Sequence, residues 1–293
     1  MKGLLVVNSF IKTTAFDELY SSLERAFFER NVALTIKGNA EVLAHIGFDA
    51  GTREKYDFVL FWDKDILLAY HLENLGCTLY NSAAAIENAD DKGRTAIILN
   101  KAKIPMPPTI LTPLTYPAVG YGDDNFINTV IRTLGFPLIL KKNKGSFGLD
   151  VYLIASRQEL IGKLKEFAGE NMLFQEYLSG ARDIRIYVAG GKAIAAAERL
   201  PQNGDFRANF ALGGKMRSYN PSTQELTLAI DAANALGLSF AGVDILLPKG
   251  GEPLVLEVNS NAHFKGLSEV SGKDIAGSIA EHIIEDVKTR KKL

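Results

Sequence analysis

The chain has 293 residues, of which 47% are hydrophobic and 23% are charged. A chain of this length and composition can bury a substantial core, in one large domain or in two or three modest ones. The net charge of −1 gives no global attraction to nucleic acid or to an anionic membrane. Cys77 is the single cysteine, which excludes an internal disulfide and a thiolate metal cluster.

The first residues, MKGLLVVNSF, contain an apolar run that is too short for a signal-peptide core. No apolar run in the sequence reaches the length needed to span a bilayer. We therefore expect a soluble, cytoplasmic protein.

Residues 1–88 alternate between short apolar runs and segments with apolar residues at helical spacing. Such an alternation predicts a small parallel α/β domain with helices on both faces of its sheet. The predicted strands are residues 3–8, 32–36, 57–62 and 77–80. The predicted helices include residues 16–30 and 66–75.

The sequence of residues 89–103, ADDKGRTAIILNKAK, predicts one helix, which ends at the proline-rich IPMPPT. This boundary leads into a mixed α/β segment, residues 89–178, and then into a second one, residues 179–293. Ser156 with Glu159, and Ser222 with Glu225, have capping-box spacing before two predicted helices. Two hairpins are predicted, with turns at Gly190-Gly191 and Gly250-Gly251, and a last helix at about residues 274–288.

Polar residues interrupt the second hairpin. A turn centred between Gly250 and Gly251 places Asp244 opposite Glu257, and Asn259 shares the face of Glu257. Two facing carboxylates repel each other unless a cation lies between them. Two carboxylates and an amide oxygen suit Mg²⁺. The alternative is an exposed sheet edge with solvated charges.

In the segment FPLILKKNKGSFGLDV, Lys141 lies at the end of a predicted strand, and a loop with two glycines follows it. Backbone N–H groups of such a loop can wrap phosphates, and the lysine can reach the same anion. The alternative is an ordinary turn. The chain has no Walker A motif, and GYGDDN lacks the third glycine of a dinucleotide fingerprint.

Basic residues recur at strand positions after LFQEYL. Asp183, Arg185 and Tyr187 share one face of the first hairpin, and Arg199 ends its partner strand. Arg207, Asn209 and Lys215 follow. Arg199, Arg207 and Lys215 together would form an anion-attracting wall opposite the acidic residues, whereas each arginine alone could be a solvated surface residue.

The ordered set of motifs resembles the ATP-grasp superfamily, and within it the RimK-like glutamate and amino-acid ligases, over roughly residues 80 to 285. The motifs are, in chain order, DK at Asp91-Lys92, LILK, GSFG, QEYL, DIR, ER, DFRAN, GVD and LEVNSN. The resemblance implies an α/β (α+β) fold in which two lobes clasp ATP: an N-terminal lobe, residues 89–178, and a C-terminal lobe, residues 179–293. A small Rossmann-like domain would precede them.

The resemblance also implies roles for individual residues. The nucleotide would contact the side chains or backbone of Lys92, Lys141, Lys144, Gly145, Ser146, Gly148, Gln175, Glu176, Tyr177, Asp183, Arg207 and Asn209. Glu176 and Tyr177 would hold adenine, and Asp183 would lie near the ribose. Arg199 would face an acyl-phosphate, with Arg207 and Asn209 near the γ-phosphate. Asp244, Glu257 and Asn259 would hold Mg²⁺, commonly as two ions, with Mn²⁺ as a substitute.

The resemblance implies an ATP-dependent ligase that joins a carboxylate substrate to an amino acid of glutamate-like chemistry through an acyl-phosphate. The alternatives are a D-alanine–D-alanine-type or other small-molecule ligase, or a nucleotide-binding module without activity. Its partners would be small molecules, or a protein or cofactor tail as acceptor, with no nucleic acid or membrane and with a dimeric or tetrameric state.

The family pattern breaks after LEVNSN, where many relatives have a proline and a small residue and this chain has AHFKG. Asn261, His263 and Lys265 are therefore the candidates for the substrate side of the site. His263 could recognise a substrate carboxylate or deprotonate an incoming ammonium group, or it could be an exposed loop residue.

Overall fold

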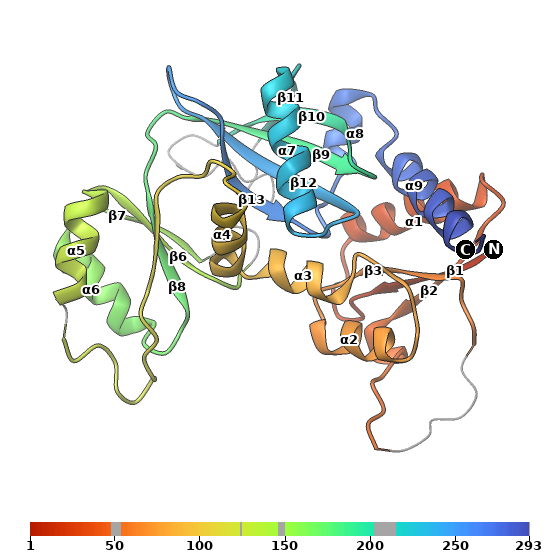
Figure 1. Cartoon of the computed structure of the whole chain (residues 1–293), viewed down its shortest axis with the longest axis horizontal. Helices are drawn as coiled ribbons and strands as arrows, with labels where there is room; N and C mark the ends of the chain where they lie inside the picture. Colours follow the sequence, from red (N-terminus) through yellow and green to blue (C-terminus); the bar gives the residue numbers. More distant parts are fainter. Residues whose placement is uncertain (48–53, 124, 146–149, 202–214, 293) are drawn as a thin grey trace.

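The computed structural model describes residues 1–47, 54–123, 125–145, 150–201 and 215–292. The strands of these residues form three sheets (Figure 1). The second sheet lies at one end and the first sheet at the other, and both chain termini lie beside the first. Among the described residues, no helix has the length and apolar character needed to cross a membrane.

The first sheet is parallel, as predicted, with strand order β2-β1-β3-β4. Its strands are β1 (Lys2–Val7), β2 (Ala33–Gly38), β3 (Phe58–Trp62) and β4 (Leu79–Tyr80). Its helices are α1 (Thr14–Phe28), α2 (Ile66–Asn74) and α3 (Ala83–Asp90), with a 3-10 turn, η1 (Asn39–Glu41). All five residues of β3 are buried, because helices cover both faces.

The helix predicted at residues 89–103 is wrong in its first turn. Helix α3 ends at Asp90, and a separate helix, α4 (Lys92–Lys101), follows. The break falls at Asp91, whose backbone is extended and whose side chain accepts a hydrogen bond from the N–H of Arg94. Asp91 therefore caps a new helix and places Lys92 at its first position.

The second sheet is antiparallel, with strand order β5-β8-β6-β7. Its strands are β5 (Thr109–Leu111), β6 (Leu138–Lys142), β7 (Val151–Ile154) and β8 (Met172–Glu176), and its helices are α5 (Asn125–Leu134) and α6 (Arg157–Glu166). Ser156 caps α6 as predicted, but Glu159 accepts from the N–H of Ala155, so only half of the capping box forms. The sheet and its helices share a small core of their own.

The third sheet is antiparallel, with strand order β11-β10-β9-β12-β13. Its strands are β9 (Arg182–Ala189), β10 (Lys192–Leu200), β11 (Lys215–Ser218), β12 (Phe240–Leu247) and β13 (Leu254–Asn259). Its helices are α7 (Thr223–Ala235), α8 (Lys265–Ser271) and α9 (Ile275–Arg290). Both predicted hairpins form, and Ser222 and Glu225 make the predicted capping box at α7.

The two faces of the third sheet differ in chemistry. One face packs against α7 through side chains such as Ile186, Val243 and Val258. The other face is apolar only at one end, where Tyr187 and Phe240 join a core with α1, α9 and the first sheet. The remainder of that face carries charged residues and forms the site described below.

The first and third sheets share one continuous core. Trp62 is 1% exposed and stacks on Phe240 with ring centroids 5.2 Å apart. Asn81 joins the same elements, since its amide donates to the carbonyls of Phe240 and Ser260 at 3.0 Å and 2.9 Å. This packing fixes the first sheet beside the charged face. The domain boundaries at residues 88 and 178 stay predictions.

Candidate active site

The predicted pairing of Asp244 with Glu257 is confirmed. The two residues are direct partners in the register of β12 and β13, and Gly242 is the partner of Asn259. The register shifts immediately afterwards, between Asp244 and Ile245. Asp244, Glu257 and Asn259 therefore share one face of the sheet, the one that is not covered by α7.

A buried network of ion pairs holds Asp244. Arg185 lies beside it on β9 and donates from Nε and Nη2 to its two carboxylate oxygens, at 2.6 Å and 2.7 Å. Arg199 Nη2 lies 2.9 Å from Oδ2 of Asp244 and also donates to both carboxylate oxygens of Asp183. The sequence placed Arg185 on this face, but not as a partner of Asp244.

Burial raises the pKa values of Asp183 and Asp244, whereas the neighbouring arginines lower them. Burial alone would raise the pKa of Asp244, but Arg185 and Arg199 outweigh it and hold that pKa below its ordinary value. Burial dominates at Asp183 and raises its pKa, although Arg199 opposes the shift. Asp244 is therefore an ionised carboxylate whose charge is already compensated.

Two lysines, from α4 and from the second sheet, lie near Glu257, the third acid of the site. Lys92, at the start of α4, has its Nζ 3.8 Å from Oε1 of Glu257 and donates to the carbonyl of Gly145 at 2.9 Å. Lys141, on β6, is 6% exposed and donates to Oε1 of Gln175 at 2.9 Å. A small cavity of 20 Å³ between α4, β6, β8 and β13 is lined by both lysines and by Gln175 and Glu257.

Burial also shifts the pKa of Lys141. Desolvation lowers this pKa to about 8, with Glu257 raising it and Lys92 lowering it. The ammonium group of Lys141 therefore lies in a position where an anion would stabilise its charged form. Gln175 is in turn held by Thr109, since its Nε2 donates to Oγ1 of Thr109 at 2.9 Å.

The residues expected at the adenine lie on the connection between the second and third sheets. Glu176 ends β8, and its N–H donates to the carbonyl of Pro108 at 2.9 Å. Tyr177 follows it, before β9 begins. Val255 on β13 donates from its N–H to the carbonyl of Pro105 at 2.9 Å, so the proline-rich segment also lies along the third sheet.

The residues that follow β13 run toward α1. A Cβ built on Gly242 would lie 2.4 Å from the Cβ of Ala262, so the missing side chain makes room for the chain to cross the sheet face there. His263 then makes a hydrogen bond of 2.9 Å from Nε2 to the carbonyl of Ala15, and its ring packs edge-on against Phe16. The long-range contacts of His263 could not be read from its spacing.

The other two candidates on the substrate side differ in what holds them. Lys265 begins α8 and pairs with Glu18 of α1. Asn261 is half-buried in the turn between β13 and α8. The segment that carries the three candidates thus joins the charged face of the third sheet to α1.

The remaining predicted positions of the site lie partly within and partly outside the described residues. Lys144 is exposed, and Gly145 has a φ of +154°, with Asp150 close to where a side chain would begin. Four further candidates lie outside the described residues: Ser146, Gly148, Arg207 and Asn209.

The acidic face can supply oxygen ligands to Mg²⁺. Among the described residues, no group of three or more His, Cys, Asp or Glu side chains is placed to hold a metal. The set here is two carboxylates and an amide. Nδ2 of Asn259 is buried without a partner, and a turn of the amide would present oxygen at that position instead. Among the described residues, the ion pair of Glu257 is the long contact to Lys92, so Glu257 fits a cation as it stands and Asn259 fits one after its amide turns.

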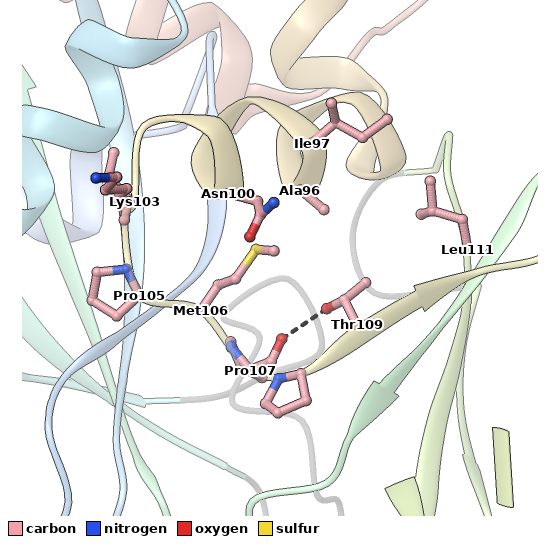
Figure 2. Close-up of a pocket in the computed structure, with 11 residues that line it drawn as sticks. Ala96, Ile97, Asn100, Lys103, Pro105, Met106, Pro107, Thr109 and Leu111 are labelled. Atoms are coloured by element: carbon pink, nitrogen blue, oxygen red, sulfur yellow. Dashed lines mark hydrogen bonds between the residues drawn. The ribbon is translucent and has the colours of Figure 1, made fainter. Parts of the chain in front are cut away.

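A larger cavity lies on the exposed side of α4 (Figure 2). It has a volume of 640 Å³ and is lined by residues of α4, of the proline-rich segment and of β5. Met106 points toward Asn100, and Thr109 donates to the carbonyl of Pro107 at 2.8 Å. Among the described residues that line it, Lys103 is the one charged side chain, whereas the smaller cavity in the cleft is lined by one acid and two lysines.

Comparisons with known proteins agree with this geometry. Residues 89–283 match the model of the RimK-like ATP-grasp domain. A "probable alpha-L-glutamate ligase" of Coxiella burnetii (strain Dugway 5J108-111) is 35% identical over 223 residues, which cover 75% of this chain and 71% of that protein. A protein of the same description from Methanococcoides burtonii is 34% identical over 251 residues, which cover 84% and 79%.

A solved structure extends the likeness to nearly the whole chain. The crystal structure of a RimK domain protein ATP-grasp from Sphaerobacter thermophilus DSM 20745 superposes with a TM-score of 0.73 at 20% identity, covering 96% of this chain and 99% of that one. At this identity the superposition shows the ATP-grasp fold. The family match and the identity to curated relatives show more: the chain belongs to the RimK-like ATP-grasp family and is an ATP-dependent carboxylate–amine ligase.

Proposed function

We propose that the protein activates a substrate carboxylate as an acyl-phosphate. A carboxylate oxygen attacks the γ-phosphorus of ATP, the bond to the β–γ bridging oxygen breaks, and ADP leaves. A neutral amine then attacks the acyl carbon, phosphate leaves with the C–O bonding pair, and the nitrogen loses a proton to give an amide. Both steps develop negative charge on oxygen, so positioning and electrostatic stabilisation supply the catalysis.

The observation that carries this proposal is the meeting of Lys92 and Lys141 with Glu257 in one cleft between the second and third sheets. The lysines would hold the α- and β-phosphates, and the loop at residues 144–148 would close over the triphosphate. Asp244, Glu257 and Asn259 would hold Mg²⁺ or Mn²⁺, commonly two ions. A bound ion would neutralise phosphate charge and polarise the γ-phosphoryl group.

The arginines supply the remaining positive charge. Arg199, with Arg207 and Asn209, would stabilise the transferred phosphoryl group. Backbone groups of Glu176 and Tyr177 would pair with adenine, and Asp183 would orient Arg199, which donates to both of its carboxylate oxygens. Asn261, His263 and Lys265 would shape the substrate side together with α1, since His263 and Lys265 contact that helix.

We propose an amino acid as the amine, with glutamate first among the candidates. This choice follows the relatives, which are described as probable alpha-L-glutamate ligases. The carboxylate substrate would be a small molecule, or the end of a peptide or cofactor tail.

An isotope-transfer assay tests the mechanism. The enzyme is incubated with ATP, Mg²⁺, a panel of amino acids and a cell extract, and mass spectrometry identifies any product heavier by one amino-acid residue. The identified carboxylate substrate is then labelled with ¹⁸O. We expect ADP as the nucleotide product and one ¹⁸O atom in the released phosphate. Formation of AMP and pyrophosphate, or phosphate without label, would contradict the acyl-phosphate route; activity with D-alanine alone would replace glutamate as the amine.

A further inference from the structure

Asp244 is the most enclosed acid of the proposed metal site. It is 1% exposed, and each of its carboxylate oxygens accepts at least one charge-assisted hydrogen bond. Oδ2 accepts from Arg185 and also lies 2.9 Å from Arg199 Nη2. A carboxylate offers about four lone-pair positions. Three of them are used in this arrangement, so little of Asp244 remains for a metal ion.

The charges around Asp244 are also compensated. The carboxylates of the described site are Asp183, Asp244 and Glu257, and the cationic side chains that face them are Arg185, Arg199, Lys92 and Lys141. The described site therefore has no excess of negative charge that would attract a free divalent cation. A nucleotide brings its own negative charge, and its phosphates offer Arg185 a second partner.

We infer that Arg185 is a positioning residue, which occupies Asp244 as a stand-in cation until the metal arrives with the nucleotide. This inference rests on the proposed magnesium site. On this basis the protein binds Mg²⁺ or Mn²⁺ much more weakly without a nucleotide than with one. The two hydrogen bonds from Arg185 keep Asp244 ionised and oriented in the enzyme without nucleotide. When the nucleotide binds, the guanidinium group moves from Asp244 to the phosphates.

Replacement of Arg185 by methionine exposes this role. Arg185→Met keeps a long, flexible side chain but removes the charge and both hydrogen bonds. Asp244 and Glu257 then lie opposite each other with one cation fewer, so a free divalent cation gains a site. Mn²⁺ binding without nucleotide, followed by electron paramagnetic resonance, should tighten at least about tenfold relative to the unmodified protein.

Matched variants separate this effect from general changes in charge or folding. Arg182 also lies on β9 and also makes a bidentate pair, with Glu198, but on the opposite face of the sheet. Arg182→Met should leave Mn²⁺ binding unchanged. Arg185→Met combined with Glu257→Gln should return Mn²⁺ affinity to the unmodified level. If Arg185→Met fails to fold, Arg185→Lys serves instead, because it keeps the charge but loses the fork; its Mn²⁺ affinity should lie in between.

The same Mn²⁺ titration, repeated with a non-hydrolysable ATP analogue, separates the role of Arg185 from the existence of the metal site. Mn²⁺ should then bind to the unmodified protein and to Arg185→Met alike. Equal Mn²⁺ affinity of these two proteins without nucleotide would overturn the role of Arg185 and leave the metal site standing. If neither protein binds Mn²⁺ even with the analogue, the metal site itself is wrong, and the role of Arg185 is overturned with it.

Discussion

Asp244 and Glu257 are direct partners across β12 and β13, yet they meet very different environments. Asp244 is fully buried between two guanidinium groups, whereas the side chain of Glu257 is 32% exposed and lies 3.8 Å from its nearest lysine. The same proposed metal site thus contains one acid in a buried network of ion pairs and one acid that is partly exposed to solvent.

Glu257→Gln should abolish most activity and leave the fold intact. Its pairing with Lys92 is long and partly solvated, so the free energy of unfolding should change by about 1 kcal/mol or less. Loss of a metal ligand should lower the rate of phosphate release at least about 100-fold, since bound cations stabilise transferring phosphates by several kcal/mol. Thermal unfolding and a phosphate assay measure both quantities. Retained turnover in a folded Glu257→Gln protein would remove this residue from the metal site.

Asp244→Asn should differ by destabilising the protein as well. It leaves Arg185 and Arg199 without their shared counter-charge in a buried site. Removal of one partner from a buried ion pair costs about 3–5 kcal/mol. Urea unfolding of Asp244→Asn and Glu257→Gln side by side checks the contrast; equal stability would show that Asp244 is better solvated than its contacts indicate.

ATP affinity should fall as the pH rises through the pKa of Lys141, about 8. Below this pKa Lys141 is a cation and attracts the phosphates; above it the amine is neutral. The loss should approach about tenfold per pH unit well above the pKa if one group titrates. Calorimetry in two buffers of different ionisation enthalpy should show proton uptake on ATP binding near pH 8 to 9. Lys141→Met should bind weakly and show no uptake, and uptake that persists in this variant would assign the proton to another group.

The same depressed pKa has a consequence for stability. The unfolded chain has an ordinary lysine pKa near 10.5, so it binds more protons than the folded protein between about pH 8 and 10.5. Stability therefore gains from Lys141 as the pH rises through that window, and it carries the full cost of the buried cation below pH 8.

The sequence predicted best where the backbone period and the turn decide the outcome. The turn at Gly250-Gly251 was enough to predict the hairpin, because such pairing depends on local geometry. Asp244 pairs with Glu257 as predicted, but the pairing also needs the register shift after Asp244: the pairs nearer the turn, such as Ile245 with Val255, would have set Asp244 opposite Leu256. The partner of Asp244 could not be predicted in this way. Arg185 is 59 positions away, and the choice between several arginines depends on how whole strands assemble.

The break between α3 and α4 was missed for a different reason. Residues 89–103 have a helical pattern throughout, and Asp91 can either continue a helix or cap a new one. The contacts of His263 and Lys265 with α1 join residues more than 240 positions apart, and no spacing rule reaches that far. Arg207 and Asn209 lie outside the described residues and stay predictions.

Asn81 should be essential for holding the first sheet to the third. It is 0% exposed, and besides its two donated bonds its Oδ1 accepts from the N–H groups of Ser239 and Phe240, at 2.7 Å and 3.3 Å. Asn81→Ala leaves these backbone groups without partners, at about 1–3 kcal/mol each, so a loss of about 3 kcal/mol or more is expected. Fluorescence of Trp62 during urea unfolding measures it. Asn234→Ala, at an exposed position of α7, is the control and should change stability by about 0.5 kcal/mol at most.

Lys265→Met should change substrate binding without a comparable change in stability. Its pair with Glu18 is solvated, with both side chains more than 40% exposed, and such pairs contribute about 0–1 kcal/mol. If Lys265 recognises a substrate carboxylate, the KM for the carboxylate or the amino acid should rise about tenfold or more while the affinity for ATP is retained. Glu18→Gln removes the shorter ion pair of Lys265, leaves the one to Glu269 at 3.8 Å and keeps the charge of Lys265, so it should not raise KM. Equal KM values in all three proteins would limit Lys265 to the contact with α1.

The position of the loop that carries His263 should depend on the absence of a side chain at Gly242. Gly242→Ala places a methyl group 2.4 Å from the Cβ of Ala262, a distance at which one of them must move. Such overpacking costs about 1–3 kcal/mol, and it should displace the chain between Asn259 and His263.

A second substitution tests that cause directly. Ala262→Gly removes the methyl group that Gly242→Ala would meet, so the double variant should recover much of the stability lost by Gly242→Ala, beyond the sum of the single effects. Gly162→Ala is the matched control, because Gly162 lies in α6 with nothing within 4 Å of its added Cβ; it should stabilise the protein by about 0.5–1 kcal/mol. If the double variant is no more stable than the two single effects predict, the close approach at Gly242 is not what positions this loop.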